Sequence, residues 1–273
     1  MERTILVTGA SSGIGRATAR AFNEEEWTVY ATARDTDDVG DLAEAGCETA
    51  ELDVTDGEQV EAVVDRIVEE HGRVDCLVNN AGYGQHGPAE DVPADLFERQ
   101  LDVNVVGPHR LVRAVLPHMR AREEGTIVNV SSVAGRLAPP GMSAYSASKF
   151  ALEGYSDALR NEVARFGIDV ALVEPGPVET NFRERAESEM KGLRRTDAYD
   201  WLYEAQEDAS LVSGDSSPFA STPEEVANTI LEAGVSTDPD PRYVVGGFAK
   251  AVLYGRFVPD RLRDRLLGLA GRL

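Results

Sequence analysis

The chain has 273 residues, 42% of them hydrophobic, and it carries 48 acidic against 27 basic residues, a formal net charge of −21 at pH 7. This apolar fraction suffices for a buried core in one large α/β domain, which excludes wholesale disorder. So acidic a surface repels phosphate backbones and anionic headgroups, and we therefore exclude nucleic acid and bulk membrane surfaces as partners.

The basic residues are almost all arginines, since only Lys149, Lys191 and Lys250 are lysines. Hyperthermophile surfaces are rich in both lysine and glutamate, so this scarcity argues against that origin of the charge. High salt screens self-repulsion and favours acidic surfaces, and we therefore expect a halophilic protein. A genomic bias toward arginine combined with ordinary acidity is the alternative, and stability measured against salt distinguishes the two.

The cysteines and histidines indicate neither a disulfide framework nor a metal site. Cys47 and Cys76 are isolated, the four histidines are scattered, and neither type clusters at metal-ligand spacing. The first residues lack the charged and long apolar regions of a signal peptide, and no apolar run reaches about 18 residues. We expect a cytoplasmic protein with no metal and no integral membrane segment.

Short apolar runs alternate with helical periodicity through most of the chain. The predicted strands are residues 5–7, 28–31, 51–52, 76–78, 126–130, 168–173 and 242–245. Regular alternation of strands and helices requires long right-handed crossovers, and so a parallel sheet with helices on both faces. The sequence predicts a doubly wound, three-layer α/β/α Rossmann fold.

The alternation breaks after Pro175. Residues 182–221 are polar and helix-prone, as expected of a helical lid over a substrate site. Residues 246–273 carry six basic against two acidic side chains, with leucines at helical spacing. We predict one domain over residues 1–245, with the lid inserted, and a C-terminal helical extension over residues 246–273. The extension either docks on a membrane surface or partner, or packs on its own body or a twin subunit.

A glycine-rich turn directly follows the first predicted strand and opens a helix. Its glycines allow a tight turn and close approach to a pyrophosphate, at which the helix N-terminus points. The spacing is TGxxxGxG, which differs from the GxGxxG of the classical dehydrogenase fingerprint. The turn consists of Thr8, Gly9, Ala10, Ser11, Ser12, Gly13, Ile14 and Gly15.

The end of the second predicted strand bears on the choice of cofactor. An acidic residue there would bind the ribose of NAD, whereas an arginine can pair with the 2′-phosphate of NADP. Ala33 occupies the expected place of the acid and Arg34 follows it, which favours NADP. Asp35 keeps NAD as the alternative, because one residue of misalignment would restore an acid at that place.

Tyr145 and Lys149 lie four residues apart on one face of a predicted helix that runs to about Arg165. A phenol with a pKa of about 10 is a poor base at neutral pH, but a nearby ammonium favours the phenolate. Tyr145 can then exchange a proton with a carbonyl or alcohol oxygen. In a chain that otherwise uses arginine, a lysine here indicates a need for a compact ammonium.

Together these motifs resemble the classical type of the short-chain dehydrogenase/reductase family. They occur in the family's order and span residues 4 to about 181. The matching elements are Thr8-Gly9-x-x-x-Gly13-Ile14-Gly15, Asp53-Val54, Asn79-Asn80-Ala81-Gly82, Asn104, Ser131-Ser132, Tyr145-x-x-x-Lys149 and Pro175-Gly176.

The resemblance implies a catalytic set of Asn104, Ser132, Tyr145 and Lys149. Tyr145 would be the general acid/base, and Lys149 would lower its pKa and bind the nicotinamide ribose. Ser132 would polarise the substrate oxygen, with Ser131 as the alternative one residue earlier. Asn104 would kink its helix and anchor a water that links Lys149 to solvent.

The resemblance also implies the cofactor contacts. Asp53 and Val54 would hold the adenine, Asn80, Ala81 and Gly82 would line the ribose side, and Pro175 and Gly176 would pass the nicotinamide. Val178 would offer backbone hydrogen bonds and Thr180 a hydroxyl to the carboxamide. The family commonly forms homodimers or homotetramers, which we expect here.

The function expected is NADP-dependent transfer of a hydride between nicotinamide and a carbonyl or alcohol substrate. The long C-terminus resembles that of steroid- and retinol-type members and hints at an apolar substrate. One alternative is a 3-oxoacyl-thioester reductase, which would need basic residues near the cleft for its acidic carrier. Another is a non-catalytic NAD(P)-sensing protein, which would not need the complete set of Asn104, Ser132, Tyr145 and Lys149.

Overall fold

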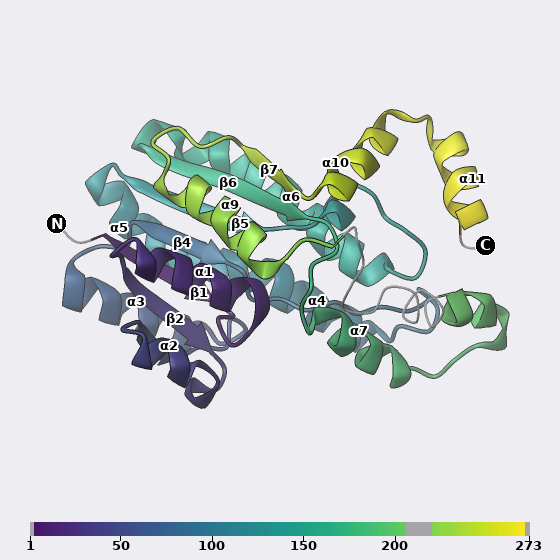
Figure 1. Cartoon of the computed structure of the whole chain (residues 1–273), viewed down its shortest axis with the longest axis horizontal. Helices are drawn as coiled ribbons and strands as arrows, with labels where there is room; N and C mark the ends of the chain where they lie inside the picture. Colours follow the sequence, from purple (N-terminus) through teal and green to yellow (C-terminus); the bar gives the residue numbers. More distant parts are fainter. Residues whose placement is uncertain (1–2, 206–219, 271–273) are drawn as a thin grey trace.

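The computed structural model describes residues 3–205 and 220–270. Its centre is a parallel sheet in the order β3-β2-β1-β4-β5-β6-β7 (Figure 1). The direction of the order reverses between β1 and β4, which creates the crevice where doubly wound folds bind ligands. The strands are β1 (Thr4–Thr8), β2 (Thr28–Ala33), β3 (Glu48–Glu51), β4 (Cys76–Asn79), β5 (Gly125–Val130), β6 (Ile168–Pro175) and β7 (Arg242–Val245).

Every predicted strand is present, and the Rossmann fold expected from the sequence is confirmed. The largest difference in bounds is in β3, which begins at Glu48 rather than at residue 51. This strand lies at the edge of the sheet, and Glu48 and Glu51 are exposed, so it carries little of the apolar signal by which strands are found.

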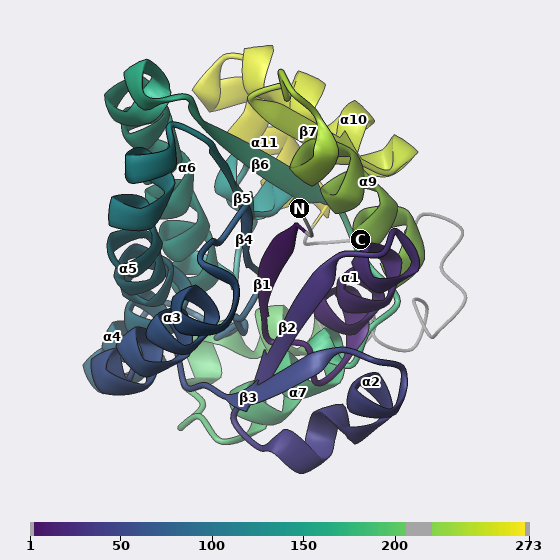
Figure 2. The same ribbon diagram turned by 90° about the vertical axis from the view of Figure 1, so that its left-hand side faces the viewer.

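Helices cover both faces of the sheet (Figure 2). One face is covered by α1 (Gly13–Glu24), α2 (Gly40–Glu44) and α9 (Pro223–Val235). The other is covered by α3 (Gly57–His71), α5 (Gly107–Arg122) and α6 (Ser143–Val163). Successive strand residues alternate between the two cores, as Ile5 and Val7 face α1 and α9 while Leu6 faces α3 and α5. The sheet is therefore buried on both faces, as a parallel sheet requires.

Short helical segments complete the chain. They are η1 (Thr36–Val39), α4 (Ala94–Leu101), the π-helical η2 (Asp102–Val106), η3 (Val133–Gly135), η4 (Ala164–Phe166), α7 (Phe182–Lys191), η5 (Asp197–Tyr199), α10 (Gly247–Leu253), η6 (Tyr254–Phe257) and α11 (Asp260–Ala270).

The inserted lid and the C-terminal extension lie toward the carboxyl ends of the strands. Figure 1 shows α7 below this edge and α10 and α11 above it. Part of the predicted lid, residues 206–219, lies outside the described residues. Ala249 of α10 is fully buried against the chain body, whereas Tyr254 and Phe257 in η6 are 74% and 83% exposed. The extension thus docks through its first helix and presents apolar side chains beyond it.

Within residues 3–205 and 220–270, no helix combines the length and apolar character needed to span a bilayer. The same residues contain no cluster of three or more histidine, cysteine, aspartate or glutamate side chains arranged to bind a metal ion.

Candidate active site

The glycine-rich turn joins the end of β1 to α1 at the carboxyl edge of the sheet. Gly9 and Gly13 have φ angles of +68° and +52°, which side chains rarely tolerate. A Cβ at Gly15 would lie 2.3 Å from the Gly9 carbonyl oxygen, so only glycine lets the helix begin this close to the turn. Ser12 caps α1 with extended backbone and without a side-chain cap hydrogen bond. This helix end, with its N–H groups and dipole, fits a pyrophosphate.

Arg16 holds the outer side of the same turn, a role that the sequence did not suggest. Its Nη2 donates to the carbonyl oxygens of Ser11 at 2.7 Å and Asp38 at 2.6 Å. The Arg16 guanidinium therefore fixes the path of the backbone that would face the phosphates. In the same turn, the side chain of Ile14 is half-buried and packs against the core.

Asp53 and Val54 follow β3 at the position expected for an adenine pocket. The Asp53 carboxylate accepts from Thr55 N at 2.9 Å and Thr55 Oγ1 at 2.7 Å. Although burial opposes it, these bonds and the charge of Arg34 hold the pKa of Asp53 below its usual value. Val54 is buried against Gly107, where a Cβ would lie 2.8 Å from a Val54 methyl.

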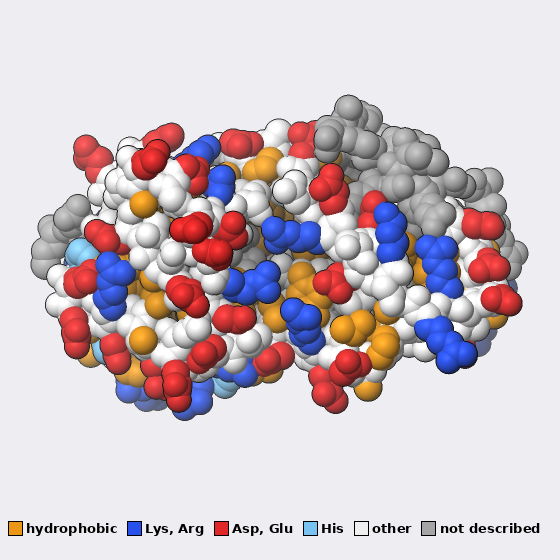
Figure 3. Space-filling view, turned by 90° about the horizontal axis from the view of Figure 1, so that it is seen from below, with side chains coloured by type: hydrophobic (Ala, Val, Ile, Leu, Met, Phe, Trp, Pro, Cys, Tyr) orange, Lys and Arg blue, Asp and Glu red, His pale blue; other side chains and the backbone are white. Residues whose placement is uncertain are grey.

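Arg34 and Asp35 are the two residues that bear on the choice of cofactor, and they differ in their contacts. The Asp35 carboxylate accepts the backbone N–H of Asp37 at 3.0 Å and caps η1. Arg34 is exposed, and its charge acts on Asp53. The arginine thus faces solvent near the predicted adenine pocket, while the acid already has a structural role. In Figure 3, basic side chains gather across the middle of a surface whose left part is mostly acidic.

The residues after β4 are tied to the glycine-rich turn. Asn80 Nδ2 donates to the carbonyl oxygens of Thr8 at 2.9 Å and Gly9 at 3.1 Å. The Thr8 hydroxyl accepts the backbone N–H groups of Asn80 and Ala81, both at 3.0 Å. A Cβ at Gly82 would lie 3.1 Å from Asn104 Oδ1. The glycine-rich turn and the residues after β4 therefore form one hydrogen-bonded unit.

Asn104 lies at the centre of the π-helical turn η2 and is 1% exposed. Its Oδ1 accepts from Tyr83 N at 3.2 Å, and its Nδ2 donates to Tyr83 O at 3.0 Å and Ser148 Oγ at 3.1 Å. This π turn interrupts the regular helix at Asn104, where the family resemblance implies a kink. The amide joins the loop after β4 to α6, beside Lys149.

Tyr145 and Ser132 meet at the carboxyl end of β5. Ser132 caps η3, where its hydroxyl accepts the backbone N–H of Ala134 at 3.1 Å. Burial raises the pKa of Tyr145 to about 12, and the nearby hydroxyl of Ser132 opposes this rise. Ser131, the alternative, is buried and faces Glu153 instead. The structure therefore places Ser132 rather than Ser131 beside the tyrosine.

Lys149 is buried on the same face of α6 as Tyr145, but its ammonium contacts neighbouring backbone. Nζ donates to Val130 O at 2.8 Å and lies 5.8 Å from the centre of the Tyr145 ring. Burial lowers the pKa of Lys149 to about 8, and the charge of Glu153 opposes this. The sequence predicts that Lys149 lowers the pKa of Tyr145, whereas the structure gives a raised value set by burial.

The chain after β6 passes back toward the glycine-rich turn. A Cβ at Gly176 would lie 3.2 Å from Ala249 of α10, so the extension packs on the turn after Pro175. Val178 forms an isolated bridge with Ser221. A Cβ at Gly13 would lie 2.8 Å from Thr180 Cγ2. Residues 175–180 therefore run from the end of β6 to the glycine-rich turn.

Two rings that the sequence did not single out lie beside the ring of Tyr145. His86 and Phe182 lie 6.1 and 5.5 Å from the Tyr145 ring, measured between ring centres. Gly84 lies between them, since a Cβ there would approach both. No motif marks such positions, because His86 lies in the loop after β4 and Phe182 begins α7, and the two meet only in the fold.

The lid is fastened to the loop after β4. The Asp91 carboxylate accepts from Tyr203 Oη at 2.7 Å and Thr196 N at 3.2 Å. Tyr203 is 1% exposed and packs with Met190 and Leu193. The described part of residues 182–221 is therefore held against the loop after β4 by a buried polar contact and a small apolar cluster.

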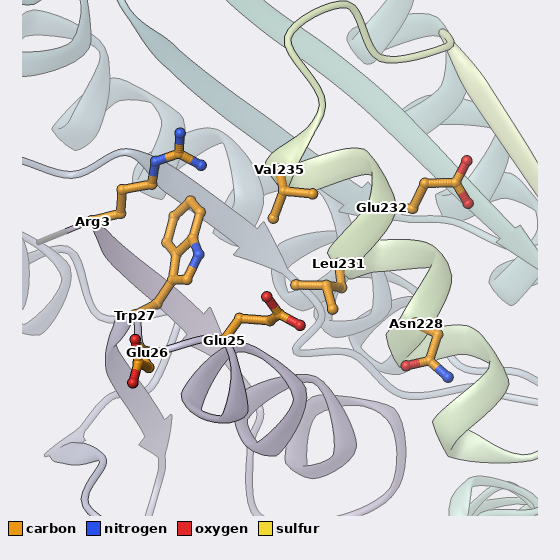
Figure 4. A pocket seen from close by; sticks show the side chains of 8 residues that line it. All are labelled: Arg3, Glu25, Glu26, Trp27, Asn228, Leu231, Glu232 and Val235. Carbon is orange, nitrogen blue, oxygen red and sulfur yellow. The ribbon is translucent and has the colours of Figure 1, made fainter.

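A cavity of about 570 Å³ lies elsewhere, between the C-terminal ends of α1 and α9 (Figure 4). Trp27, Leu231 and Val235 form its apolar side, and Arg3, Glu25, Glu26, Asn228 and Glu232 complete it. It lies beside the first residue of β1, at the amino edge of the sheet. Since doubly wound folds bind ligands at the carboxyl edge, this cavity is separate from the site around Tyr145.

A doubly wound fold with a glycine-rich turn after β1 and a Tyr–Ser–Lys group at the same edge of the sheet is typical of a dinucleotide-dependent oxidoreductase. The chain belongs to the short-chain dehydrogenase family, whose family model matches residues 3–191. The members of this family act on alcohol and carbonyl groups.

Individual relatives agree with the family. Human 17-beta-hydroxysteroid dehydrogenase type 1 is 39% identical over 259 residues, which cover 89% of this chain and 77% of the relative. A short-chain dehydrogenase from Streptomyces avermitilis has a TM-score of 0.83 and 40% identity, covering 97% of this chain and 94% of that one. The closed form of serine dehydrogenase complexed with NADP+ has a TM-score of 0.78 and 27% identity, covering 90% and 95%.

Proposed function

We propose that the chain is an NADP-dependent oxidoreductase that interconverts a carbonyl and an alcohol, with Tyr145 as general acid/base. The observation that carries this proposal is the placement of Ser132 next to the buried Tyr145, with the Lys149 ammonium 5.8 Å from the Tyr145 ring, at the edge of the sheet that bears the glycine-rich turn.

The residues of the chain handle the proton and the oxygen. With a pKa near 12, Tyr145 is protonated at neutral pH and can donate to a carbonyl oxygen. Ser132 donates to the same oxygen and stabilises the charge that develops there. Lys149 remains charged below about pH 8 and adds a positive potential behind the tyrosine. A bound nicotinamide supplies or accepts the hydride.

Arg34 and Asp35 support NADP over NAD. An exposed guanidinium beside the adenine pocket can pair with a 2′-phosphate, and Asp35 already accepts the Asp37 N–H. Kinetics with NADPH and NADH test this choice. Arg34→Ala should raise the KM for NADPH more than that for NADH, and equal effects on both would contradict the proposal.

An apolar substrate is supported by the walls of the site. Phe182 lies against Tyr145, and apolar residues of the lid pack on the loop that carries His86. The human relative named above is a hydroxysteroid dehydrogenase. A panel of aliphatic, aromatic and steroidal ketones and alcohols, assayed in molar salt, identifies the preferred class.

A 3-oxoacyl-thioester reductase is the second candidate. Arg185, Lys191 and Arg194 are exposed on and after α7, where an acidic carrier would approach the cleft. Including a carrier-bound and a free 3-oxoacyl thioester in the panel separates the two. Faster turnover of the carrier-bound form, lost at high salt, would favour this candidate.

Catalysis itself is tested with Tyr145→Phe, which removes only the hydroxyl. We expect turnover to fall by at least about a thousandfold while the Kd for NADPH stays unchanged. Retained turnover would refute the role of Tyr145, and an inactive wild type on every substrate would favour a nucleotide-sensing protein.

We also propose a halophilic homo-oligomer. Phe150, on the outer side of α6 next to Lys149, is 46% exposed, and the surface charge suits high salt. Light scattering and thermal unfolding between dilute buffer and molar salt test both properties. A monomer, or a stability independent of salt, would contradict the respective statement.

A further inference from the structure

A cluster of charged side chains lies behind the candidate catalytic residues. It consists of Glu153 and Asp157 on α6, Glu174 on β6, Arg136 after η3 and Arg242 on β7, and we call it the carboxylate–arginine cluster. Glu174 is fully buried and Glu153 is 5% exposed. Buried carboxylates are costly unless they are paired, so their presence calls for a physical reason.

Arg242 joins the elements of the cluster. Its Nε donates to Glu153 Oε2 at 3.1 Å and lies 3.1 Å from Glu174 Oε1. Its Nη2 donates to both oxygens of Asp157 at 2.7 Å. One guanidinium thus ties the last strand to α6, which carries Tyr145 and Lys149, and to β6, which leads into Pro175.

Arg136 joins the Ser132 loop to the same cluster. Arg136 lies four residues after Ser132, and its Nη1 donates to Glu174 Oε1 at 2.6 Å. Gly135 fits between this loop and α6, since a Cβ there would lie 3.0 Å from Ser131 Oγ, 3.1 Å from Glu153 Cγ and 3.1 Å from the Lys149 carbonyl carbon. Glu153 therefore packs directly behind the loop that presents Ser132.

Glu153 also follows Lys149 by one helical turn on the buried face of α6. The groups that face it are Ser131 after β5, Glu174 on β6 and Arg242 on β7. Burial raises the pKa of Glu153, the nearby Glu174 raises it further, and Ser131 and Arg242 oppose the rise. In turn, the charge of Glu153 raises the pKa of Lys149 against the effect of burial.

We propose that Glu153 is a positioning residue of the active site, held by Arg242 from the last strand, which fixes the Ser132 loop and supplies the negative charge behind the Lys149 ammonium. It touches neither substrate nor cofactor and acts through its neighbours. The activity measurements below rest on the proposed function. The protonation of Lys149, in contrast, can be measured without any turnover.

Because the chain has few lysines, the titration of Lys149 can be followed directly. Lysine labelled with ¹³C at Cε gives signals from Lys149, Lys191 and Lys250 alone, and Lys191 and Lys250 are exposed. Their titration is compared in the wild type, in Glu153→Gln and in the control Asp157→Asn. The control also removes a carboxylate that binds Arg242, but Asp157 lies one turn farther from Lys149.

We expect the proton affinity of Lys149 to fall about tenfold in Glu153→Gln and to stay unchanged in Asp157→Asn. The alkaline limb of the pH profile of kcat should move to lower pH with it, while the KM for substrate changes little. A titration of Lys149 in Glu153→Gln that matches the wild type would overturn the electrostatic role.

The variant Glu153→Asp tests whether Glu153 fixes the Ser132 loop. It also allows a test of the proposal if Glu153→Gln does not fold. It keeps the charge but shortens the reach to Arg242, so kcat should fall severalfold while the Lys149 titration and the pH profile remain those of the wild type. An unchanged kcat would overturn the positioning of the Ser132 loop. Failure of the proposed reaction itself appears instead as an inactive wild type or an active Tyr145→Phe.

Discussion

Replacing Lys149 by methionine should stabilise the fold while abolishing turnover. Lys149 is buried, and its pKa lies at about 8 instead of 10.5 because burial disfavours the ammonium. At pH 7 the lysine is charged in both the folded and the unfolded chain, and the shift of the pKa corresponds to about 3 kcal/mol against folding. Methionine fills similar volume without this cost.

The substitution also removes one favourable contact. The Val130 carbonyl oxygen, which accepts from Lys149 Nζ at 2.8 Å, would lose its partner at a cost of about 1 kcal/mol. The variant should therefore unfold with a free energy about 2 kcal/mol larger than that of the wild type at pH 7. Urea unfolding at constant salt and without added nucleotide measures this difference.

The dependence on pH provides the refutation. Because the folded pKa is depressed, the unfolded chain binds more protons between pH 8 and 10.5, and the wild type gains stability as the pH rises through this window. Between pH 7 and pH 10 the wild type should gain about 2.5 kcal/mol relative to Lys149→Met, so that the advantage of the variant disappears at pH 10. An advantage that is absent at pH 7, or that is the same at both pH values, would show that the ammonium bears no burial cost.

Three further substitutions test other parts of the structure. Gly15→Ala forces a Cβ to 2.3 Å from the Gly9 oxygen and should weaken NADPH binding at least about tenfold by calorimetry, whereas Gly57→Ala, with open space around it, should not. Asp75→Ala leaves the Thr4 N–H unpaired and the buried Arg73 with only the longer contact to Glu124 at 3.7 Å, and it should cost about 3 kcal/mol in urea unfolding, against little for the exposed Glu124→Ala. Tyr203→Phe removes the bond to Asp91 and should raise the KM for substrate about fivefold with kcat unchanged, and an unchanged KM would separate the lid from substrate binding.

The sequence predicted the sheet because each strand is a compact apolar run. Strands buried on both faces, such as residues 126–130, carry this signal in a few consecutive residues, and the glycine-rich turn and the Tyr145–Lys149 pair are likewise local patterns. The exposed edge strand β3 carried less signal, and its start was predicted three residues late.

The side-chain environment of the site could not be predicted in the same way. Whether Ser131 or Ser132 meets Tyr145 depends on how the chain turns after β5, and the sequence left both open. The contact of Lys149 with Val130 O, 19 residues earlier, decides where its ammonium lies, and no spacing rule encodes it. Arg242 and Glu153 are 89 residues apart and become partners only because β7 is placed beside β6 and α6.

The charge of the chain has different meanings at the surface and at the site. Outside, carboxylates are in large excess and make the protein strongly anionic. Inside, Glu153 and Glu174 are met by Arg242 and Arg136, because an unpaired carboxylate there would be too costly. The same arginines connect the loop of Ser132, the helix of Tyr145 and the strand that leads to Pro175. The buried charges in this chain therefore hold these elements in place as well as neutralising one another. The net charge of the surface predicts neither the positioning nor the pairing.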